Sequence, residues 1–310
     1  MRPHIEDLSP HRPANPIDMT ALLHAVGGWA DATVRDEPDR AEPDKPATLI
    51  DANPLSLDGV APHPVDGFVD GVQRGISLTY REQRPVVLAY AAAGAVDGSH
   101  RPFAVAEHLQ LVSAEADRAW LQGLLGDQAV PIDTIDSDDP SVCQARAAQA
   151  AGLLREQVER SLTTDLTGRS DLRLLILDGS LLGRPHDTTL VGVAKTHTRR
   201  YLADERAIYR LPVGWRSPRF TIPPGAVGNA HELHSCYVRL ADAQHRHWSY
   251  GLIRIEAYEV DLLEPVAAAC LANRQRGGHD PRGDRHLAGI RAVERFLTAR
   301  QPAMFSLSLT

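Results

Sequence analysis

The apolar run Leu174–Leu177 constrains the fold more than any other segment of the chain. Four uninterrupted apolar residues that are followed by Asp178 and Gly179 are typical of a short strand buried on both faces. Such a strand requires helices above and below its sheet. We therefore expect an α/β domain in which Asp178 stands at the carboxyl end of a central strand, where open α/β sheets bind their ligands. An ordinary Asp-Gly turn is the alternative interpretation of this position.

The composition excludes several classes of protein. Of the 310 residues, 43% are hydrophobic and 24% are charged, so the chain is neither disordered, collagen-like nor a disulfide miniprotein. No stretch approaches the ~20 apolar residues of a membrane span, and the first sixteen residues lack the apolar core of a secretory signal. We expect a cytoplasmic protein with no membrane contact and with reduced, buried thiols at Cys143, Cys236 and Cys270.

The charge pattern singles out one lysine. Forty acidic residues against 33 basic ones give a net charge of −7, which excludes coating of nucleic acid by bulk electrostatics. Only Lys45 and Lys195 are lysines, an imbalance that a GC-rich coding sequence would explain. Lys195 ends the strand-like run LVGVA and precedes the hydroxyl-rich and basic segment 196–200. It could hold a phosphate or stabilise developing negative charge, or simply extend from a strand end into solvent.

The pattern along the chain predicts a mixed α/β domain. Residues 1–64 are expected to form an N-terminal helical extension, with a helix at 19–34, and a Pro- and Asp-rich linker. The main domain is expected at 65–310. Within it, alternation and apolar runs predict strands at 65–80, 84–96, 103–112, 172–181, 188–200, 235–240 and 248–258. Helical spacing predicts helices at 114–125, 145–162, 262–273 and 284–299, and 133–141 is expected to be a polar loop.

Further acidic residues stand where packing alone would not require them. Asp70 follows Phe68 and Val69 in the first predicted strand, which makes it a candidate site residue. The alternative interpretation is a β-bulge or hairpin in which Asp70 is solvated. In the helix at 145–162, Glu159 lies on the shoulder of the apolar stripe and Glu156 lies opposite to it, although both could belong to a solvated face. Carboxylates from separate elements suit Mg²⁺ or Mn²⁺, which prefer oxygen ligands.

The C-terminal region offers two more candidates. Asp284 is expected to cap the last helix, and His286 in its first turn could act as a proton carrier or outer ligand. Other familiar motifs are absent from the sequence. There is no Walker loop and no GxSxG elbow, and HELH at 231–234 lacks the spacing that places two imidazoles on one helix face.

Taken together, these motifs resemble the NurA nucleases over roughly 65–297. The most specific part is LLILDGSL, followed eight residues later by LVGVAKTHTRR. The resemblance implies an RNase H-like mixed sheet flanked by helices and cleavage of DNA with Mn²⁺ or Mg²⁺. It also implies a homodimer that works with a HerA-like hexameric ATPase in DNA end resection, a step of DNA repair.

The resemblance also assigns roles to individual positions. The implied metal ligands and catalytic residues are Asp70, Glu159 (with Glu156 as substitute), Asp178, Lys195 near the scissile phosphate, and His286 or Asp284 as the last member. The first motif departs from the Asp-Gly-Ser of the family, because Val72 follows Gly71 here. Two other functions remain open: a catalytically inactive RNase H-like subunit that binds DNA or assembles an ATPase complex, and an RNase H-like enzyme that acts on RNA.

Overall fold

A computed structural model describes most of the chain. It covers residues 46–125, 130–184, 186–197, 199–202, 204–224, 230–243, 247–275 and 286–302. The chain divides into two compact units, Met1–Asp36 and Glu37–Thr310, and every described residue belongs to the second. The helix expected at 19–34 and the candidate Asp284 lie outside the described residues.

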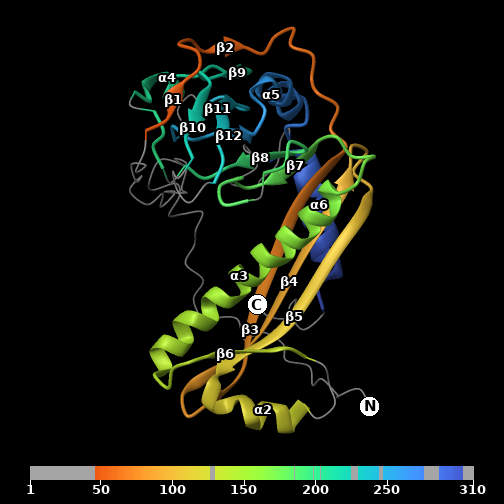
Figure 1. Cartoon of the computed structure of the whole chain (residues 1–310), viewed down its shortest axis with the longest axis vertical. Coiled ribbons are helices and arrows are strands. Elements are labelled where there is room, and N and C mark those ends of the chain that lie inside the picture. Colours follow the sequence, from red (N-terminus) through yellow and green to blue (C-terminus); the bar gives the residue numbers. More distant parts are fainter. Residues whose placement is uncertain are drawn as a thin grey trace, which may run out of the picture. The chain divides into compact units, whose positions relative to one another are not determined.

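A single large sheet organises the described part of the chain (Figure 1). Its main path runs β1-β10-β11-β12-β8-β7-β3-β4-β5-β6, and β2 and β9 pair beside it. In chain order the strands are β1 (Thr48–Leu49), β2 (Leu55–Ser56), β3 (Gly67–Arg81), β4 (Arg84–Asp97), β5 (Pro102–Ala114), β6 (Ile132–Ile135), β7 (Leu175–Asp178), β8 (Leu190–Ala194), β9 (Trp215–Arg216), β10 (Phe220–Ile222), β11 (Leu233–Arg239) and β12 (Leu252–Ala257).

The middle of this sheet has RNase H-like topology. Strands β3, β4 and β5 form an antiparallel meander, and the chain then crosses in a helix to β7 on the other side of β3. Strand β7 is parallel to β3, and β8 is parallel to β7, which gives the order β5-β4-β3-β7-β8. The predicted mixed α/β fold is confirmed, and the run at 174–177 is fully buried, as its sequence predicts.

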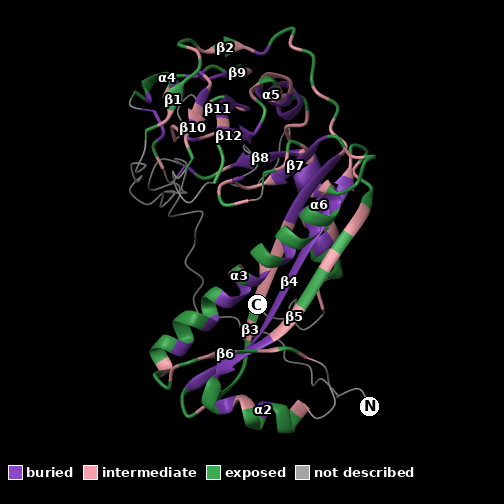
Figure 2. Ribbon diagram, viewed as in Figure 1, coloured by how far each residue is buried: buried purple, intermediate pink, exposed green. Residues whose placement is uncertain are grey.

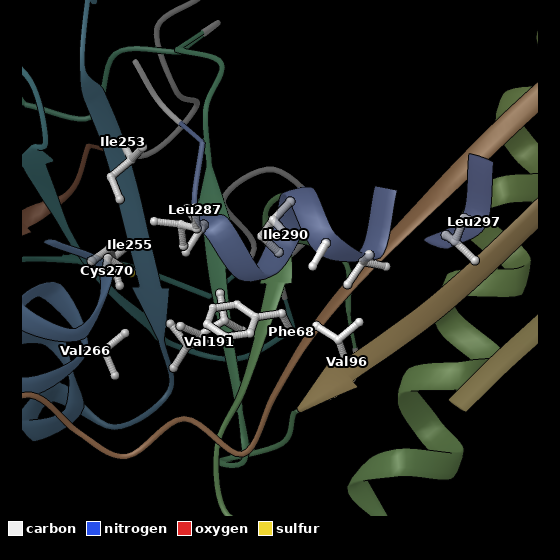
Figure 3. Packing of buried hydrophobic residues seen from close by; sticks show 14 of the residues in the cluster. Phe68, Val96, Val191, Ile253, Ile255, Val266, Cys270, Leu287, Ile290 and Leu297 are labelled. Carbon is white, nitrogen blue, oxygen red and sulfur yellow. The ribbon is translucent and has the colours of Figure 1, made fainter. Parts of the chain in front are cut away.

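Helices cover both faces of the sheet. They are α2 (Arg118–Leu125), α3 (Pro140–Thr167), α4 (Arg206–Tyr209), α5 (Leu263–Ala272) and α6 (Ala288–Arg300), with short 3₁₀ turns at Glu115–Asp117 and Val260–Leu262. The apolar stripe of α3 packs on one face with Val69 and Leu177. Helices α5 and α6 pack on the other face around Phe68 and Val191 (Figure 3). Strand β4, sandwiched between α3 and α6, is buried along almost its whole length (Figure 2).

Two sequence expectations about helix and loop bounds need correction. The expected loop at 133–141 instead contains part of β6 and the start of α3. Helix α3 begins there because Pro140 fits the first helical position and the Asp139 side chain accepts a hydrogen bond from the Ser141 amide at 2.8 Å. His286 precedes α6 rather than lying in its first turn, since the helix begins at Ala288.

The described part of the expected linker joins the sheet. Strand β1 pairs with β10, and β2 pairs with β9, so the segment 46–64 contributes to the same sheet as the main domain. Asp51 fixes this segment by accepting hydrogen bonds from Arg216 and Arg219 at 3.1 and 2.8 Å. All three cysteines are free and buried, as expected. Among the described helices, none is long and apolar enough to cross a membrane.

Candidate metal centre

Asp70 and Asp178 lie side by side on adjacent parallel strands. Strand β3 pairs with β7 in a register that matches Phe68 with Ile176 and Val69 with Leu177. The next residue of each strand is an aspartate. Because side chains alternate between faces, both aspartates leave the sheet on the side of Phe68 and Ile176, which is the side covered by α6.

A third carboxylate reaches the same place from α6. Carboxylate oxygens of Asp70, Asp178 and Glu294 all lie within 4.8 Å of one another. Glu294 sits on the packed side of α6, between Ile290 and Leu297 in the helical repeat, and both of these side chains are fully buried against the sheet. Arg291 donates to its Oε2 at 2.8 Å from one turn earlier.

Two glycines let α6 approach the sheet closely enough for this contact. A Cβ on Gly289 would lie 2.2 Å from the Phe68 ring, and a Cβ on Gly94 of β4 would lie 2.9 Å from the Leu297 side chain. Both distances are shorter than real Cβ contacts, so no larger residue fits at either position without a shift. The close helix–strand packing in Figure 3 therefore depends on two residues without side chains, and it fixes the position of Glu294.

Lys195 is part of the same group. It follows β8 two residues after Val193, which pairs with Asp178, so its side chain leaves the sheet on the same face. Its Nζ donates to Asp178 Oδ2 at 2.7 Å, and the side chains are only 16% and 20% exposed. The structure thus brings three of the residues selected from the sequence, Asp70 within β3, Asp178 at the end of β7 and Lys195 just after β8, to one point on the sheet.

The electrostatics of the group centre on Asp70, which is 4% exposed. Burial raises the pKa of Asp70 well above its ordinary value, and the neighbouring charge of Asp178 raises it further. Lys195 and the Gly71 amide, which donates to Asp70 Oδ1 at 2.7 Å, oppose this shift only in part. Burial and the nearby charge of Asp178 therefore disfavour the ionised form of the Asp70 carboxyl.

Glu159 lies close to this group but outside it. It comes from α3, on the opposite face of the sheet, and its carboxylate rests on the backbone of Gly71, where a Cβ would be only 2.4 Å from Oε1. Arg155 and Arg184 each donate to it at 2.9 Å. Burial raises the pKa of Glu159 despite both arginines. Since Glu159 is 1% exposed, these two ion pairs satisfy a charge that would otherwise be costly to bury.

The remaining candidates take different positions. His286 is buried at the edge of the group, with Nδ1 3.9 Å from Glu294 Oε2. Glu156, the substitute for Glu159, is exposed on the outer side of α3. Asp284 falls outside the described residues.

Glu294 was not selected from the sequence, although the sequence contained a signal for it. Ile290, Val293 and Leu297 form the apolar stripe of α6, and Glu294 follows Ile290 by four residues and precedes Leu297 by three. An acid inside an apolar stripe is the same signal that pointed to Glu159. What the sequence does not show is that the stripe faces the part of the sheet that carries Asp70 and Asp178.

The three carboxylates fit a hard divalent cation. They offer oxygen atoms from three separate elements at a mutual separation that one ion can bridge. A bound cation would favour the ionised form of Asp70, which burial and the nearby charge of Asp178 disfavour. Residues able to hold it are Asp70, Asp178 and Glu294, whereas Glu159 lies on the opposite face of the sheet and is paired with two arginines.

Comparisons with known proteins add little to this geometry. No protein-family model matches the chain, and no match was found among curated proteins. Among solved structures, the chain is similar to the Argonaute of Aquifex aeolicus, with a TM-score of 0.23 and 12% sequence identity. The match covers 77% of this chain and 29% of that chain, so this chain spans less than a third of the Argonaute's length. A similarity at this level carries no conclusion about fold or activity.

Proposed function

We propose that the chain is a metal-dependent nuclease that hydrolyses phosphodiester bonds of DNA. The observation that carries the proposal is the convergence of Asp70, Asp178 and Glu294 within 4.8 Å, on the two central parallel strands of an RNase H-like sheet and the helix that covers them. Carboxylates clustered in this way hold the cations that assist phosphodiester hydrolysis. Mn²⁺ and Mg²⁺ are the proposed cofactors, because both prefer carboxylate oxygens.

Each residue has a task in this proposal. Asp70, Asp178 and Glu294 would hold a divalent cation, which would supply positive charge beside the phosphate and lower the pKa of a bound water molecule. Asp70, the most buried of the three, would bind the ion with a carboxylate whose ionised form burial disfavours in its absence. Lys195, whose Nζ lies 2.7 Å from Asp178 Oδ2, orients this carboxylate, and its ammonium group would lie beside the substrate phosphate. His286 lies where it could exchange a proton with the Glu294 side of the group.

The choice of DNA and the biological context rest on the sequence resemblance to NurA nucleases. From it we propose DNA end resection, a homodimeric assembly and a HerA-like hexameric ATPase as partner. Glu159 stays in the proposal as a second-cation ligand that would exchange Arg184 for the ion. A net charge of −7 favours dependence on a partner to deliver DNA.

The test is cleavage of labelled DNA by purified protein with Mn²⁺, Mg²⁺ or EDTA. The variants Asp70→Asn, Asp178→Asn and Glu294→Gln should each abolish metal-dependent cleavage. The matched control is Glu156→Gln, which neutralises an exposed acid on α3 and should cleave like the wild-type protein. An RNA substrate of the same sequence runs alongside and tests the RNA alternative.

Two results would overturn the proposal. Cleavage that persists in EDTA or in Asp178→Asn would come from a contaminating nuclease or from another site. No cleavage by the wild-type protein with either metal, even with a HerA-type ATPase added, would favour the inactive DNA-binding or assembly subunit.

A further inference from the structure

A buried ion pair lies behind the candidate metal centre. Arg254 and Glu256 on β12 are 4% and 0% exposed, and Arg254 donates to Glu256 Oε1 at 2.9 and 2.6 Å. Both side chains alternate with Ile253 and Ile255, which face α5 and α6, so the pair lies on the opposite face from Asp178. Removing two charges from water is unfavourable, and well-packed apolar residues of similar volume are often at least as stabilising as a buried ion pair. The pair therefore calls for a reason beyond stability.

Glu256 uses its second oxygen to hold the turn after Asp178. Its Oε2 accepts hydrogen bonds from the Ser180 hydroxyl and the Leu181 amide, both at 2.7 Å. Strand β8 lies between Glu256 and this turn, and the residue of β8 that pairs with Glu256 is Gly192. A Cβ on Gly192 would lie 2.8 Å from the Gly179 carbonyl oxygen. The turn thus lies directly over Gly192, and the Glu256 carboxylate of β12 holds it by two hydrogen bonds.

This turn connects the two halves of the site. Gly179 has φ +127°, a value that favours glycine, and the chain there passes from the face of Asp178 to the face of α3. At the end of the turn Arg184 reaches Glu159 at 2.9 Å, and the Tyr258 hydroxyl donates to the Arg184 carbonyl at 3.2 Å. A change at the middle of the turn would therefore move both Asp178 and the partner of Glu159.

We propose that Glu256 is a positioning residue of the metal centre, which holds the turn 179–184 from behind the sheet and thereby fixes the carboxylate of Asp178. This inference rests on the proposed function, because it deepens the account of the same site. Removing a residue that orients a metal ligand without touching the metal typically weakens metal binding by 10–100-fold. Glu256 touches neither the other carboxylates nor a substrate position in any described contact, so its effect would pass through the turn.

The test compares Glu256→Gln with Asp117→Asn. Asp117 is also fully buried and paired with arginines, Arg81 and Arg84, but it lies at the far end of the β3–β4 hairpin from Asp70. Both variants should lower the melting temperature. Only Glu256→Gln should weaken Mn²⁺ binding, measured by titration calorimetry, by 10–100-fold. If Glu256→Gln fails to fold, Ser180→Ala removes one hydrogen bond to the same carboxylate and should weaken Mn²⁺ binding in the same direction.

A second measurement reads the position of Asp178 without metal or activity. Lys195 and Lys45 are the only lysines, so ¹³C-methylation of lysine amines gives few NMR signals. The Lys195 signal, assigned with a Lys195→Arg variant, should move in Glu256→Gln toward its position in Asp178→Asn.

The outcomes separate the two proposals. The positioning role would be overturned if a folded Glu256→Gln or Ser180→Ala protein bound Mn²⁺ within twofold of the wild-type affinity and its Lys195 signal did not move. That result would leave the nuclease proposal intact. Wild-type protein that binds no Mn²⁺ would overturn the nuclease proposal, and the Lys195 signal alone would then decide whether Glu256 positions Asp178.

Discussion

A methyl group added at Gly289 should disable the metal centre while leaving the fold intact. The new Cβ would lie 2.2 Å from the Phe68 ring, whereas ordinary contact begins near 3.4 Å. Phe68 is 1% exposed and packed among Val191, Ile290 and neighbouring apolar side chains, so its ring has no room to move. The helix must therefore retreat from the sheet at Gly289 by about 1.2 Å.

The displacement reaches Glu294. Leu297, packed on Gly94, holds the other end of α6, and Glu294 is three residues from Leu297 while Gly289 is eight. A tilt of the helix about Leu297 moves Glu294 by about 0.5 Å, and a translation moves it by the full shift of about 1.2 Å. Metal–ligand distances tolerate only about 0.2 Å. We expect Gly289→Ala to weaken Mn²⁺ binding at least tenfold and to lower the cleavage rate by roughly 100-fold.

The effect on stability should be small by comparison. Overpacking costs about 1–3 kcal/mol, and alanine recovers up to about 1 kcal/mol relative to glycine in a helix. A matched control is Gly152→Ala on α3, where the new Cβ would meet Gln73 at an ordinary 3.6 Å. That variant should keep wild-type Mn²⁺ affinity and melt at the same or a slightly higher temperature. Calorimetric titration with Mn²⁺ and thermal melting decide the matter: a folded Gly289→Ala protein with wild-type Mn²⁺ affinity would refute the argument.

Three further predictions concern buried charges. Because burial raises the pKa of Asp70, the metal-free protein should lose stability as pH rises from about 4 through that raised pKa, and Asp70→Asn should lose less. Urea unfolding in EDTA at a series of pH values checks this. The same pH dependence of the unfolding free energy in both proteins would contradict it. Glu159→Gln leaves Arg184 facing a neutral amide and should cost about 2–3 kcal/mol in urea unfolding, so a cost below about 1 kcal/mol would speak against the ion pairs. Arg239→Met removes donors to the Ile208, Leu211 and Trp248 carbonyls and should cost about 3 kcal/mol or more, and an unchanged midpoint would count against that role.

The order of elements follows from local patterns in the sequence. The hairpin of β3 and β4, the third strand β5, the amphipathic helix α3 and the buried strand β7 were all predicted near their observed bounds. Alternation, apolar runs and helical spacing are short-range properties, so the sequence carries them directly. The strand-end position of Asp178 and the place of Lys195 after β8 follow from the same patterns.

Short strands stabilised by distant partners were not predictable in this way. Strands β1, β2, β9 and β10 have two or three residues each and exist because they pair with one another and with β11. Strands this short cannot show the alternation of polar and apolar residues by which a strand is predicted from sequence. From the sequence alone, residues 46–64 are therefore predicted to be part of a linker, and only their pairing with β9 and β10 shows that they contain strands.

The sequence by itself determined that Asp70 stands within a strand and that Asp178 ends one, but only the tertiary structure decided which acids meet. Glu159 lies on the shoulder of the apolar stripe of one helix and Glu294 lies within the stripe of another, so the local pattern does not tell which of them reaches Asp70 and Asp178. Helix α3 packs on the face opposite to Asp70 and delivers Glu159 to two arginines, whereas α6 packs on the face of Asp70 and Asp178 and delivers Glu294 to them. The physical reason is that a helix's own periodicity fixes which side it buries, while the face of the sheet that receives this side depends on chain crossings and on close contacts such as Gly289 against Phe68.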